Sequence, residues 1–264
     1  MINQGVLQKM RTEIGSPIQY FLKMDNEEIH MNDLIEKDVH IHYQGQQCLS
    51  CMEKKQIYRQ GNCYDCFWDQ PSLGDWIMKP ELSKAHLGIE DRDLEYEKAV
   101  QLTPHIVYLA LSSDVKVGVT RKTQVPTRWI DQGANAAIEI LEAPNRYLAG
   151  ITEVALKDYV SDKTNWRKML KNDVPQLNLV AIKDHLTQYI PQEAKDYILK
   201  ENDKMLNLNF PVVQYPDKVK SLNLTKTPEY QGRLMGIKGQ YFIFEDNTVF
   251  NVRGNEGTVI KLEY

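Results

Sequence analysis

Residues 105–134 read HIVYLALSSDVKVGVTRKTQVPTRWIDQGA, and this stretch decides the fold. HIVYLALS and VKVGVT are rich in strand-forming residues and flank Ser113 and Asp114, which is typical of a β-hairpin. Pro126 lies where a helix can begin, and Gly133 lies where it can end. The stretch therefore predicts two strands followed by a helix.

The residues that follow extend this pattern. AAIEILEA (136–143) alternates like a third strand, and RYLAGITEVALKDYVSDK (146–163) carries apolar residues at helical spacing. A further helix is predicted from about Pro191 to Leu208, with Pro191 in its first turn. GIKGQYFIFEDNTVFNVRGNEGTVIKLEY (236–264) predicts a β-meander with a turn at Asp246 and Asn247. We expect this meander to pack with the N-terminal strands.

The N-terminal third of the chain predicts strands around a cysteine cluster. Two short runs recur at every second position, Ile18, Tyr20 and Leu22 and then Val39, Ile41 and Tyr43, which predicts strands. Residues 67–104 are turn-rich and then acidic, which predicts a connector with at most a short helix. The predicted fold class is α+β. The predicted parts are an N-terminal β segment (1–47), a zinc ribbon (48–66), the connector (67–104), an α/β core (105–185), and a C-terminal helix with the β-meander (186–264).

Composition indicates an ordinary globular protein. The chain has 264 residues, 42% of them hydrophobic, and a formal net charge of −4. Residues 105–172 carry ten Lys and Arg against seven Asp and Glu, a weak local excess of positive charge. The start lacks the apolar run of a secretory signal, and no later segment approaches the roughly 20 apolar residues of a membrane span. A cytoplasmic location and no membrane partner are therefore expected.

The four cysteines of the chain form one cluster, Cys48, Cys51, Cys63 and Cys66, in two C-x2-C pairs with eleven residues between them. Two such pairs can complete the tetrahedral four-thiolate site that zinc prefers. The alternatives are two disulfides, which a cytoplasmic location disfavours, and four free thiols, which the clustering disfavours. A closed four-thiolate site has no open coordination position, so the predicted Zn²⁺ is structural. Such ribbons contact nucleic acid, contact protein, or only staple a subdomain.

The element order and residues of 105–172 resemble the GIY-YIG nuclease family, which includes homing endonucleases, DNA-repair excision nucleases and some restriction enzymes. The resemblance rests on IVY at residues 106–108, KVG at residues 116–118, Arg128, Glu153 and Asn165. It implies a ββαβα core, in agreement with the order predicted from periodicity.

The resemblance also implies roles in phosphodiester cleavage around one Mg²⁺. Tyr108 would activate water, Arg128 would stabilise charge on the phosphorane, and Glu153 would bind the metal. Lys116, Arg121 and Asn165 would bind the substrate.

Three positions depart from the family pattern. Lys116 stands where the family has its second Tyr, Ile106 stands at the first glycine, and Gln132 falls near a His of several nucleases. Because Lys116 replaces the second Tyr, the site lacks one of the phenols that the family uses around the nucleophile.

Simpler interpretations of the same residues stay open. Tyr108 can pack in a sheet, Arg128 can stack on Trp129, and Glu153 can pair with Lys157 one helical turn away.

A closer resemblance covers nearly the whole chain and is to an uncharacterised bacterial family known only as a domain of unknown function. It rests on the stretches GVLQKMRTEIGSPIQYFL, KPEL, HIVYLALSSDVKVGVTR, PTRWIDQGA, EVALKDYVSDKTNWR and GIKGQYFIF, and on the four cysteines. This resemblance supports the domain order and implies no activity.

The leading functional hypothesis is a Mg²⁺-dependent nucleic-acid endonuclease in which the zinc ribbon positions DNA or RNA. One alternative is a nucleic-acid-binding module that kept the fold and lost the chemistry. Another is a scaffold whose zinc ribbon recruits a protein partner.

Overall fold

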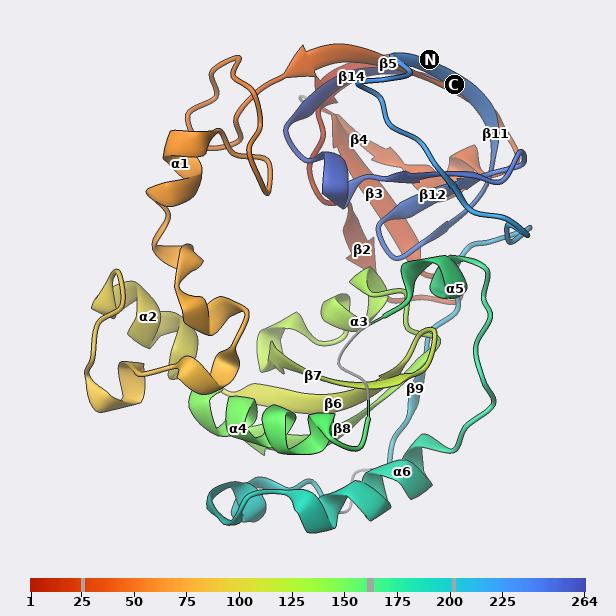
Figure 1. The fold of residues 1–264 in the computed structure, drawn as a ribbon. Helices are drawn as coiled ribbons and strands as arrows, with labels where there is room; N and C mark the ends of the chain where they lie inside the picture. The colour runs from red at the N-terminus through yellow and green to blue at the C-terminus, as the bar shows by residue number, and fades with distance from the viewer. Residues whose placement is uncertain (25–26, 161–163, 201–202) are drawn as a thin grey trace. The chain divides into compact units, whose positions relative to one another are not determined.

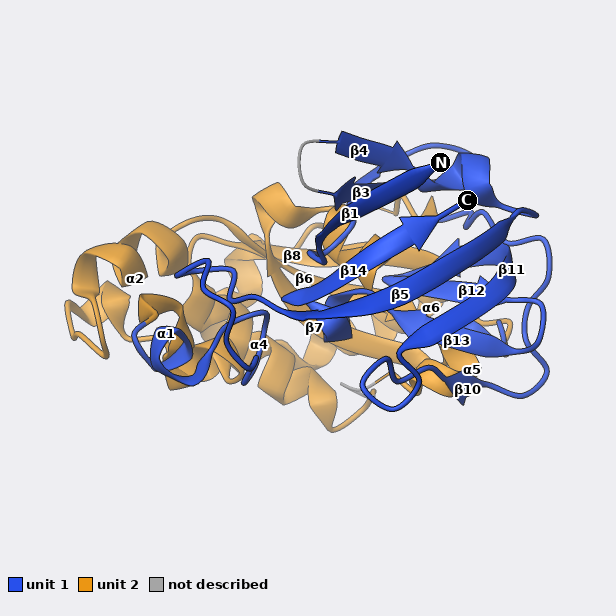
Figure 2. Ribbon diagram, turned by 90° about the horizontal axis from the view of Figure 1, so that it is seen from above, with its two compact units in different colours: residues 1–69, 170–172, 208–264 blue, residues 70–169, 173–207 orange. Residues whose placement is uncertain are grey.

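The chain divides into two compact units. A computed structural model describes residues 1–24, 27–160, 164–200 and 203–264 (Figure 1). Unit 1 contains Met1–Asp69, Leu170–Asn172 and Leu208–Tyr264, and unit 2 contains Gln70–Met169 and Asp173–Asn207 (Figure 2). Helices and strands both build the fold, so the predicted α+β class is confirmed.

Unit 1 is built on a seven-stranded sheet in the order β1-β14-β5-β11-β12-β13-β10. Its strands are β1 (Ile2–Val6), β5 (Asp38–Gln46), β10 (Lys220–Ser221), β11 (Glu229–Lys238), β12 (Tyr241–Phe244), β13 (Thr248–Asn251) and β14 (Thr258–Glu263). The β-meander prediction is confirmed, because β11, β12 and β13 pair in sequence and antiparallel. Strand β5 lies between β14 and β11 and is antiparallel to both, so the C-terminal strands pack with an N-terminal one, as expected.

Strand β5 separates a buried face from a polar face. Val39 and Ile41 are buried, whereas His40 and His42 lie on the alternate side and are half-buried. This arrangement follows from the period of two in a strand, which directs successive side chains to opposite faces of the sheet. The alternation predicted from Val39 and Ile41 is therefore confirmed.

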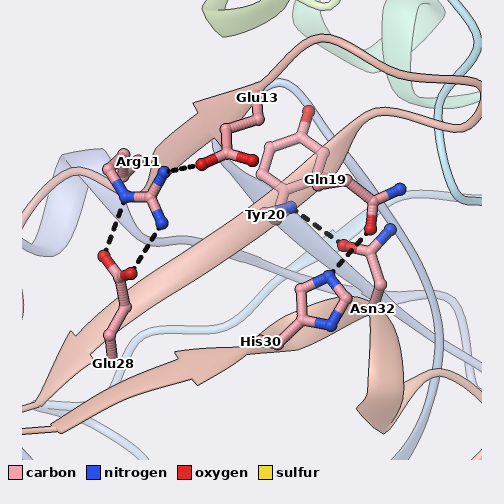
Figure 3. Close-up of polar contacts among 7 residues, drawn as sticks. All are labelled: Arg11, Glu13, Gln19, Tyr20, Glu28, His30 and Asn32. Carbon is pink, nitrogen blue, oxygen red and sulfur yellow. Dashed lines mark hydrogen bonds and ion pairs between the residues drawn. The ribbon is translucent and has the colours of Figure 1, made fainter.

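A second sheet of unit 1 has three strands, β2 (Arg11–Glu13), β3 (Gln19–Met24) and β4 (Glu27–His30). Asn32 holds the start of β3: its Oδ1 accepts from the Tyr20 amide at 2.9 Å, as Figure 3 shows, and its Nδ2 donates to the Ile18 carbonyl at 2.9 Å. In the same view Arg11 contacts both oxygens of Glu28. The Arg11 pair is exposed, so its net contribution to stability is small, whereas Asn32 satisfies two backbone groups.

Unit 2 contains a four-stranded antiparallel sheet in the order β7-β6-β8-β9. Its strands are β6 (His105–Leu111), β7 (Val115–Arg121), β8 (Ala136–Ala143) and β9 (Leu206–Asn207), and helices α3 (Thr127–Asp131) and α4 (Arg146–Lys157) connect to them. The predicted order of strand, strand, helix, strand, helix is confirmed. Residues 161–163, which end the stretch predicted as the second helix, lie outside the described residues.

The apolar core of unit 2 lies on one face of this sheet. Val107 and Leu109 of β6 pack there with Val117 of β7, and α4 contributes Leu156. Helix α6 (Leu179–Leu186) adds further apolar side chains to the same core. Because strand side chains alternate, Tyr108 and its cross-strand partner Gly118 belong to the opposite face.

The helix predicted from about Pro191 to Leu208 is wrong. The described part of this stretch contains a 3₁₀ helix at Gln192–Tyr197 and then extended chain. The Leu199 amide donates to the Ile140 carbonyl at 2.9 Å, and β9 pairs with Ala136 and Ala137. Strand β8 would otherwise present unpaired backbone groups at the sheet edge, and hydrogen bonding to that edge overrides the helical pattern.

The remaining helices are short. They are α1 (Tyr64–Trp68), α2 (Leu94–Gln101) and α5 (Trp166–Leu170). Helix α2 lies in the acidic end of the predicted connector, and Asp93 caps it by accepting from the Tyr96 amide at 3.0 Å. In the described part of the chain, no helix is both long and apolar enough to cross a membrane.

Helix α4 is held by close contact with the 3₁₀ turn at Pro80–Leu82, the centre of the KPEL stretch. A Cβ atom on Gly150 would lie 2.2 Å from the Glu81 amide nitrogen and 2.3 Å from the Pro80 carbonyl carbon. Both atoms belong to the backbone, so neither can rotate away. Gly150 therefore allows the helix and the turn to meet.

We expect Gly150→Ala to destabilise unit 2 by roughly 1–3 kcal/mol, the usual cost of overpacking. Alanine alone would favour the helix by about 1 kcal/mol, so a loss of stability isolates the steric clash. Urea unfolding followed by circular dichroism measures the difference. Val154→Ala on the exposed side of the same helix is the matched control and should change stability by no more than about 0.5 kcal/mol. A Gly150→Ala protein as stable as wild type would contradict the steric explanation.

Candidate functional site

The four cysteines come together in unit 1. Cys48, Cys51, Cys63 and Cys66 each offer a sulfur atom, and these atoms all lie within 4.8 Å of one another. Four thiolates bound to one zinc ion at about 2.3 Å would be roughly 3.8 Å apart. The cluster is therefore within reach of a single metal ion.

Two tight turns place these sulfur atoms. The Met52 amide donates to the Cys48 carbonyl at 3.0 Å and closes the first turn. In the second turn, Gln60 and Gly61 both have positive φ, at 49° and 73°. A Cβ on Gly61 would also lie 2.3 Å from Leu49 Cδ1, so the positive φ and the close approach of the Leu49 side chain both favour glycine at this position.

Asn62 joins the two turns. Its side chain is buried, its Oδ1 accepts from Ser50 Oγ at 2.7 Å, and its Nδ2 donates to the Gln60 carbonyl at 2.9 Å. The next residue, Cys63, donates its amide to Cys48 Sγ at 3.3 Å. The spacing of the cysteines alone does not identify Asn62. The structure adds that it fixes the spacing of the cysteine pairs.

The thiols have unequal acidity because they share a small space. Burial raises the pKa of Cys48, but hydrogen bonds from the amides of Cys63, Cys51 and Ser50 outweigh it and bring the pKa to about 6. The hydrogen bond with Cys63 and burial raise the pKa of Cys66 to about 12. One thiolate therefore suppresses ionisation of its neighbours, and four thiolates together need a cation.

A second set of predicted residues lies in unit 2, around Tyr108. Its side chain is buried, and its hydroxyl and the Gln132 amide are joined by hydrogen bonds of 3.0 and 3.3 Å. Trp129 packs beside it, with ring centroids 5.7 Å apart. A Cβ on Gly118 would lie 2.7 Å from the Tyr108 hydroxyl oxygen. Gly118 of the KVG stretch is thus the position that makes room for the phenol.

Arg128 and Glu153 both act on this phenol. Burial raises the pKa of Tyr108, the charge of Arg128 and the hydrogen bond with Gln132 lower it, and the Glu153 carboxylate raises it. Arg128 comes from α3 and Glu153 from α4. The structure therefore brings the three predicted catalytic residues into one electrostatic neighbourhood. Glu153 is itself largely buried and lies 3.7 Å from Lys157, the pairing weighed from the sequence.

The three predicted substrate-binding residues lie in different settings. Lys116 is buried on β7 opposite Ala110, and Arg121 is exposed at the end of the same strand. Asn165 caps α5, because its Oδ1 accepts from the amides of Arg167 and Lys168 at 3.2 Å each. Its own amide donates to Ser113 Oγ at 2.9 Å. Asn165 thus has a structural task of its own beside the turn that joins β6 to β7.

Sequence reasoning missed Arg146, the first residue of α4. Its guanidinium donates to the carbonyls of Trp76 at 3.1 Å and Ile77 at 2.9 Å. Burial lowers the pKa of Arg146 to about 10, and Glu153 opposes that shift while Arg121 and Arg128 add to it. The guanidinium stays charged at neutral pH. No periodicity or motif distinguishes a buried arginine at a helix start from an exposed one.

Two further groups belong to this neighbourhood. Burial lowers the pKa of His105 to about 4, with Arg146 and Arg121 contributing, so its imidazole is neutral at pH 7. Its Nδ1 lies 2.7 Å from the Thr103 carbonyl, and its buried Nε2 has no hydrogen-bond partner among the described residues. Glu81 opposes the lowering of the Arg146 pKa, and one of its oxygens is buried without a hydrogen bond in the described chain. The KPEL stretch was noted from the sequence, but nothing in it indicated this role.

Comparison with known proteins identifies the family of this chain but no activity. A family model described as "Protein of unknown function (DUF2797)" matches residues 36–260. No curated protein and no solved structure matches the chain. The expected membership in a family of unknown function is therefore confirmed.

We expect the cysteine cluster to bind one metal ion through sulfur. Protein loaded with Co²⁺ should show the intense near-ultraviolet absorption of thiolate–cobalt bonds, and Cys48→Ser should lose at least the contribution of one of the four bonds, because its hydroxyl is a weaker ligand than a thiolate. Lys54→Ser, at an exposed position between the cysteine pairs, is the control and should keep the absorption. Full thiolate–cobalt absorption in Cys48→Ser would contradict a four-sulfur site.

Proposed function

We propose that this chain, which belongs to the DUF2797 family, cleaves phosphodiester bonds of nucleic acid with the core of unit 2 and holds a structural Zn²⁺ in unit 1. One observation carries the first part. Tyr108, Arg128 and Glu153 come from a strand and two helices, and yet the last two both act on the phenol of the first. A phenol, a guanidinium and a carboxylate are the groups that the GIY-YIG resemblance assigns to this reaction.

The positive groups fit the charge that develops on phosphate. In-line attack on a phosphodiester places extra negative charge on the equatorial oxygens. Arg128 can bind two of these oxygens with its planar fork. Arg146 is held by two backbone carbonyls and keeps its charge at neutral pH. Its charge and that of Glu153 attract each other, so we propose that Arg146 positions the Glu153 carboxylate.

Tyr108 acts as a hydroxyl that orients water. Its raised pKa keeps the phenol protonated near pH 7, so it donates one hydrogen bond and accepts another. Gln132 is placed for either of those bonds, because it can accept from the phenol at 3.3 Å or donate to it at 3.0 Å; we propose that it uses one of them in the reaction. The attacking water takes the other, and its proton passes to bulk solvent or to a phosphate oxygen.

Glu153 is the residue that would hold Mg²⁺. Bound there, the ion would polarise the phosphate oxygens and stabilise the leaving oxygen. A carboxylate oxygen is the donor that Mg²⁺ prefers. Lys157, 3.7 Å away, balances the charge of Glu153 when the cation is absent. Loss of that pairing is part of the cost of binding the metal.

The chemistry of the four sulfur atoms supports Zn²⁺ in the cysteine cluster. Thiolates are soft ligands that select zinc over Mg²⁺ or Ca²⁺, and a closed set of four leaves no position for substrate. We propose that this site orders the two turns and positions DNA or RNA for the core. Tyr64 and Trp68 beside the cluster are exposed, at 60% and 45%, and can stack on bases.

A second candidate function is binding without cleavage. The favouring observation is that Tyr108 is 1% exposed and that Lys116 replaces the second family Tyr. Lys116 is opposite Ala110, two residues from Tyr108 on β6, and an ammonium group can bind phosphate, whereas a phenol that water does not reach cannot activate it. A third candidate is a scaffold that recruits a protein through the exposed aromatic residues of α1.

The test is cleavage of single-stranded, duplex and branched DNA and RNA with Mg²⁺ or with EDTA. We expect Mg²⁺-dependent cleavage that Arg128→Ala and Glu153→Gln each slow by roughly 100-fold or more, the usual effect of removing a charge-stabilising group. Arg92→Ala and Glu95→Gln change exposed residues of the same unit and should keep the wild-type rate.

Binding measured in EDTA separates the candidates. Substrates that are bound but not cut, with weaker binding in Arg128→Ala and an affinity that falls with salt, would replace the nuclease proposal by the binding module. Neither cutting nor binding would overturn both and direct attention to protein partners of the zinc ribbon.

A further inference from the structure

A group of potential metal ligands lies on the polar face of the large sheet in unit 1, apart from the cysteines. His40 and His42 are two residues apart on β5, so their side chains share one face. Glu263 on β14 is the direct cross-strand partner of His40, and Glu229 on β11 is the partner of His42. Figure 2 shows β5 between β14 and β11, which is why carboxylates from two other strands reach the histidines.

The ligand atoms of His40, His42 and Glu263 all lie within 4.8 Å of one another. The two imidazole rings are 3.8 Å apart between centroids and are tilted by 41°. His42 Nε2 lies 3.5 Å from a Glu263 oxygen. Two ligands bound at about 2.0–2.1 Å to one tetrahedral ion would be roughly 3.3 Å apart. The 3.5 Å between His42 Nε2 and the Glu263 oxygen is close to the spacing that a shared ion imposes.

His42 is oriented for such an ion. Its Nε2 atom is buried and makes no hydrogen bond within the described chain, although the Glu263 carboxylate lies beside it. On the other side of the ring, a Glu229 oxygen lies 3.7 Å from Nδ1. Metal-binding histidines commonly have a carboxylate on the nitrogen that does not bind the metal, because it fixes the ring and its tautomer. The two carboxylates around His42 match these two tasks.

We propose that His40, His42 and Glu263 form a second metal site, for a divalent transition ion such as Zn²⁺ or Ni²⁺. Two imidazoles and one carboxylate favour these ions over Mg²⁺ and Ca²⁺, which prefer oxygen ligands only. Three protein ligands leave at least one coordination position open, in contrast to the closed cysteine cluster. This site is independent of the chemistry proposed for unit 2.

The surroundings allow a fourth ligand. A hollow of about 330 Å³ adjoins His40 and Glu263 and is also lined by Asp38 and Gln231. It has room for a water molecule or a small carboxylate at the open position. Lys261 pairs with Glu263 at 2.5 Å. A bound ion would take over the neutralisation of Glu263, and the flexible lysine would turn toward solvent.

The experiment uses the full chain without a polyhistidine tag, with the cysteine cluster loaded with Zn²⁺ and excess metal removed. Calorimetric titration with Zn²⁺ at pH 7.5 should show one further ion per chain. His40→Ala, His42→Ala and Glu263→Gln should each weaken this binding by at least tenfold, because loss of a residue that only orients a ligand already costs 10–100-fold. His185→Ala, at an exposed position in unit 2, should bind as wild type does.

Two measurements distinguish the loss of a metal ligand from misfolding of the variant. The unfolding midpoint and the thiolate–cobalt absorption of each variant should match wild type, since the three side chains lie on a polar face. Titration with Ni²⁺ should give the same ranking of variants, and Mg²⁺ should give no heat at this site. The proposal is overturned if wild type binds no further Zn²⁺ with a dissociation constant below about 1 mM, or if the His40→Ala, His42→Ala double variant keeps the wild-type affinity.

Discussion

The pairing of β6 with a strand on each side is the constraint on which unit 2 depends. Every residue of β6 is buried and has a partner on β7, and the same strand pairs with β8 from His105 to Leu111. The two ladders fix the register of β6, with one residue of β8 skipped between the partners of Val107 and Tyr108, and a slip by one residue would move side chains to the wrong face. Val107 and Leu109 then belong to the apolar core, and Tyr108 between them belongs to the other face.

The same constraint explains why a glycine faces Tyr108. A fixed register sets Gly118 directly opposite the phenol, where no Cβ atom fits. The contact between Gly150 and the 3₁₀ turn at Pro80–Leu82 sets the position of α4, and with it that of Glu153 and Arg146. The electrostatic neighbourhood of Tyr108 is therefore a result of backbone approach at two glycines. The residues next to each charged side chain in the sequence do not determine this arrangement.

Most elements that depend on a local sequence pattern were predicted correctly. The hairpin, α3, β8, α4 and the C-terminal meander all follow from periodicity and turn residues in continuous stretches. The stretch after Pro191 was wrong because its conformation is decided by the open edge of β8, a partner more than 50 residues away in the chain. Helix α6 was missed, although Asn178 caps it by accepting from the amides of Val180 and Ala181.

Site residues could be predicted where a local pattern or a family resemblance marks them, and not where distant segments must pack together. The cysteines were predictable because their spacing is itself the signal, and Tyr108, Arg128 and Glu153 because a family resemblance orders them. Arg146 and His105 depend on burial, which arises only when distant segments pack. His40, His42 and Glu263 depend on strand pairing between the two ends of the chain, since β5 meets β14 across more than 200 residues.

Unit 1 thus brings together two sets of ligands with different chemistry. The sulfur atoms come from two tight turns that are close in sequence, and they enclose a position that solvent and substrate cannot reach once four ligands are in place. The imidazoles and carboxylates come from three strands of a sheet that forms whether or not a metal binds. A site built on turns gains its order from the ion, whereas a site built on paired strands is already ordered. The cysteine cluster therefore suits a permanent structural ion, and the histidine face of β5 suits one that exchanges.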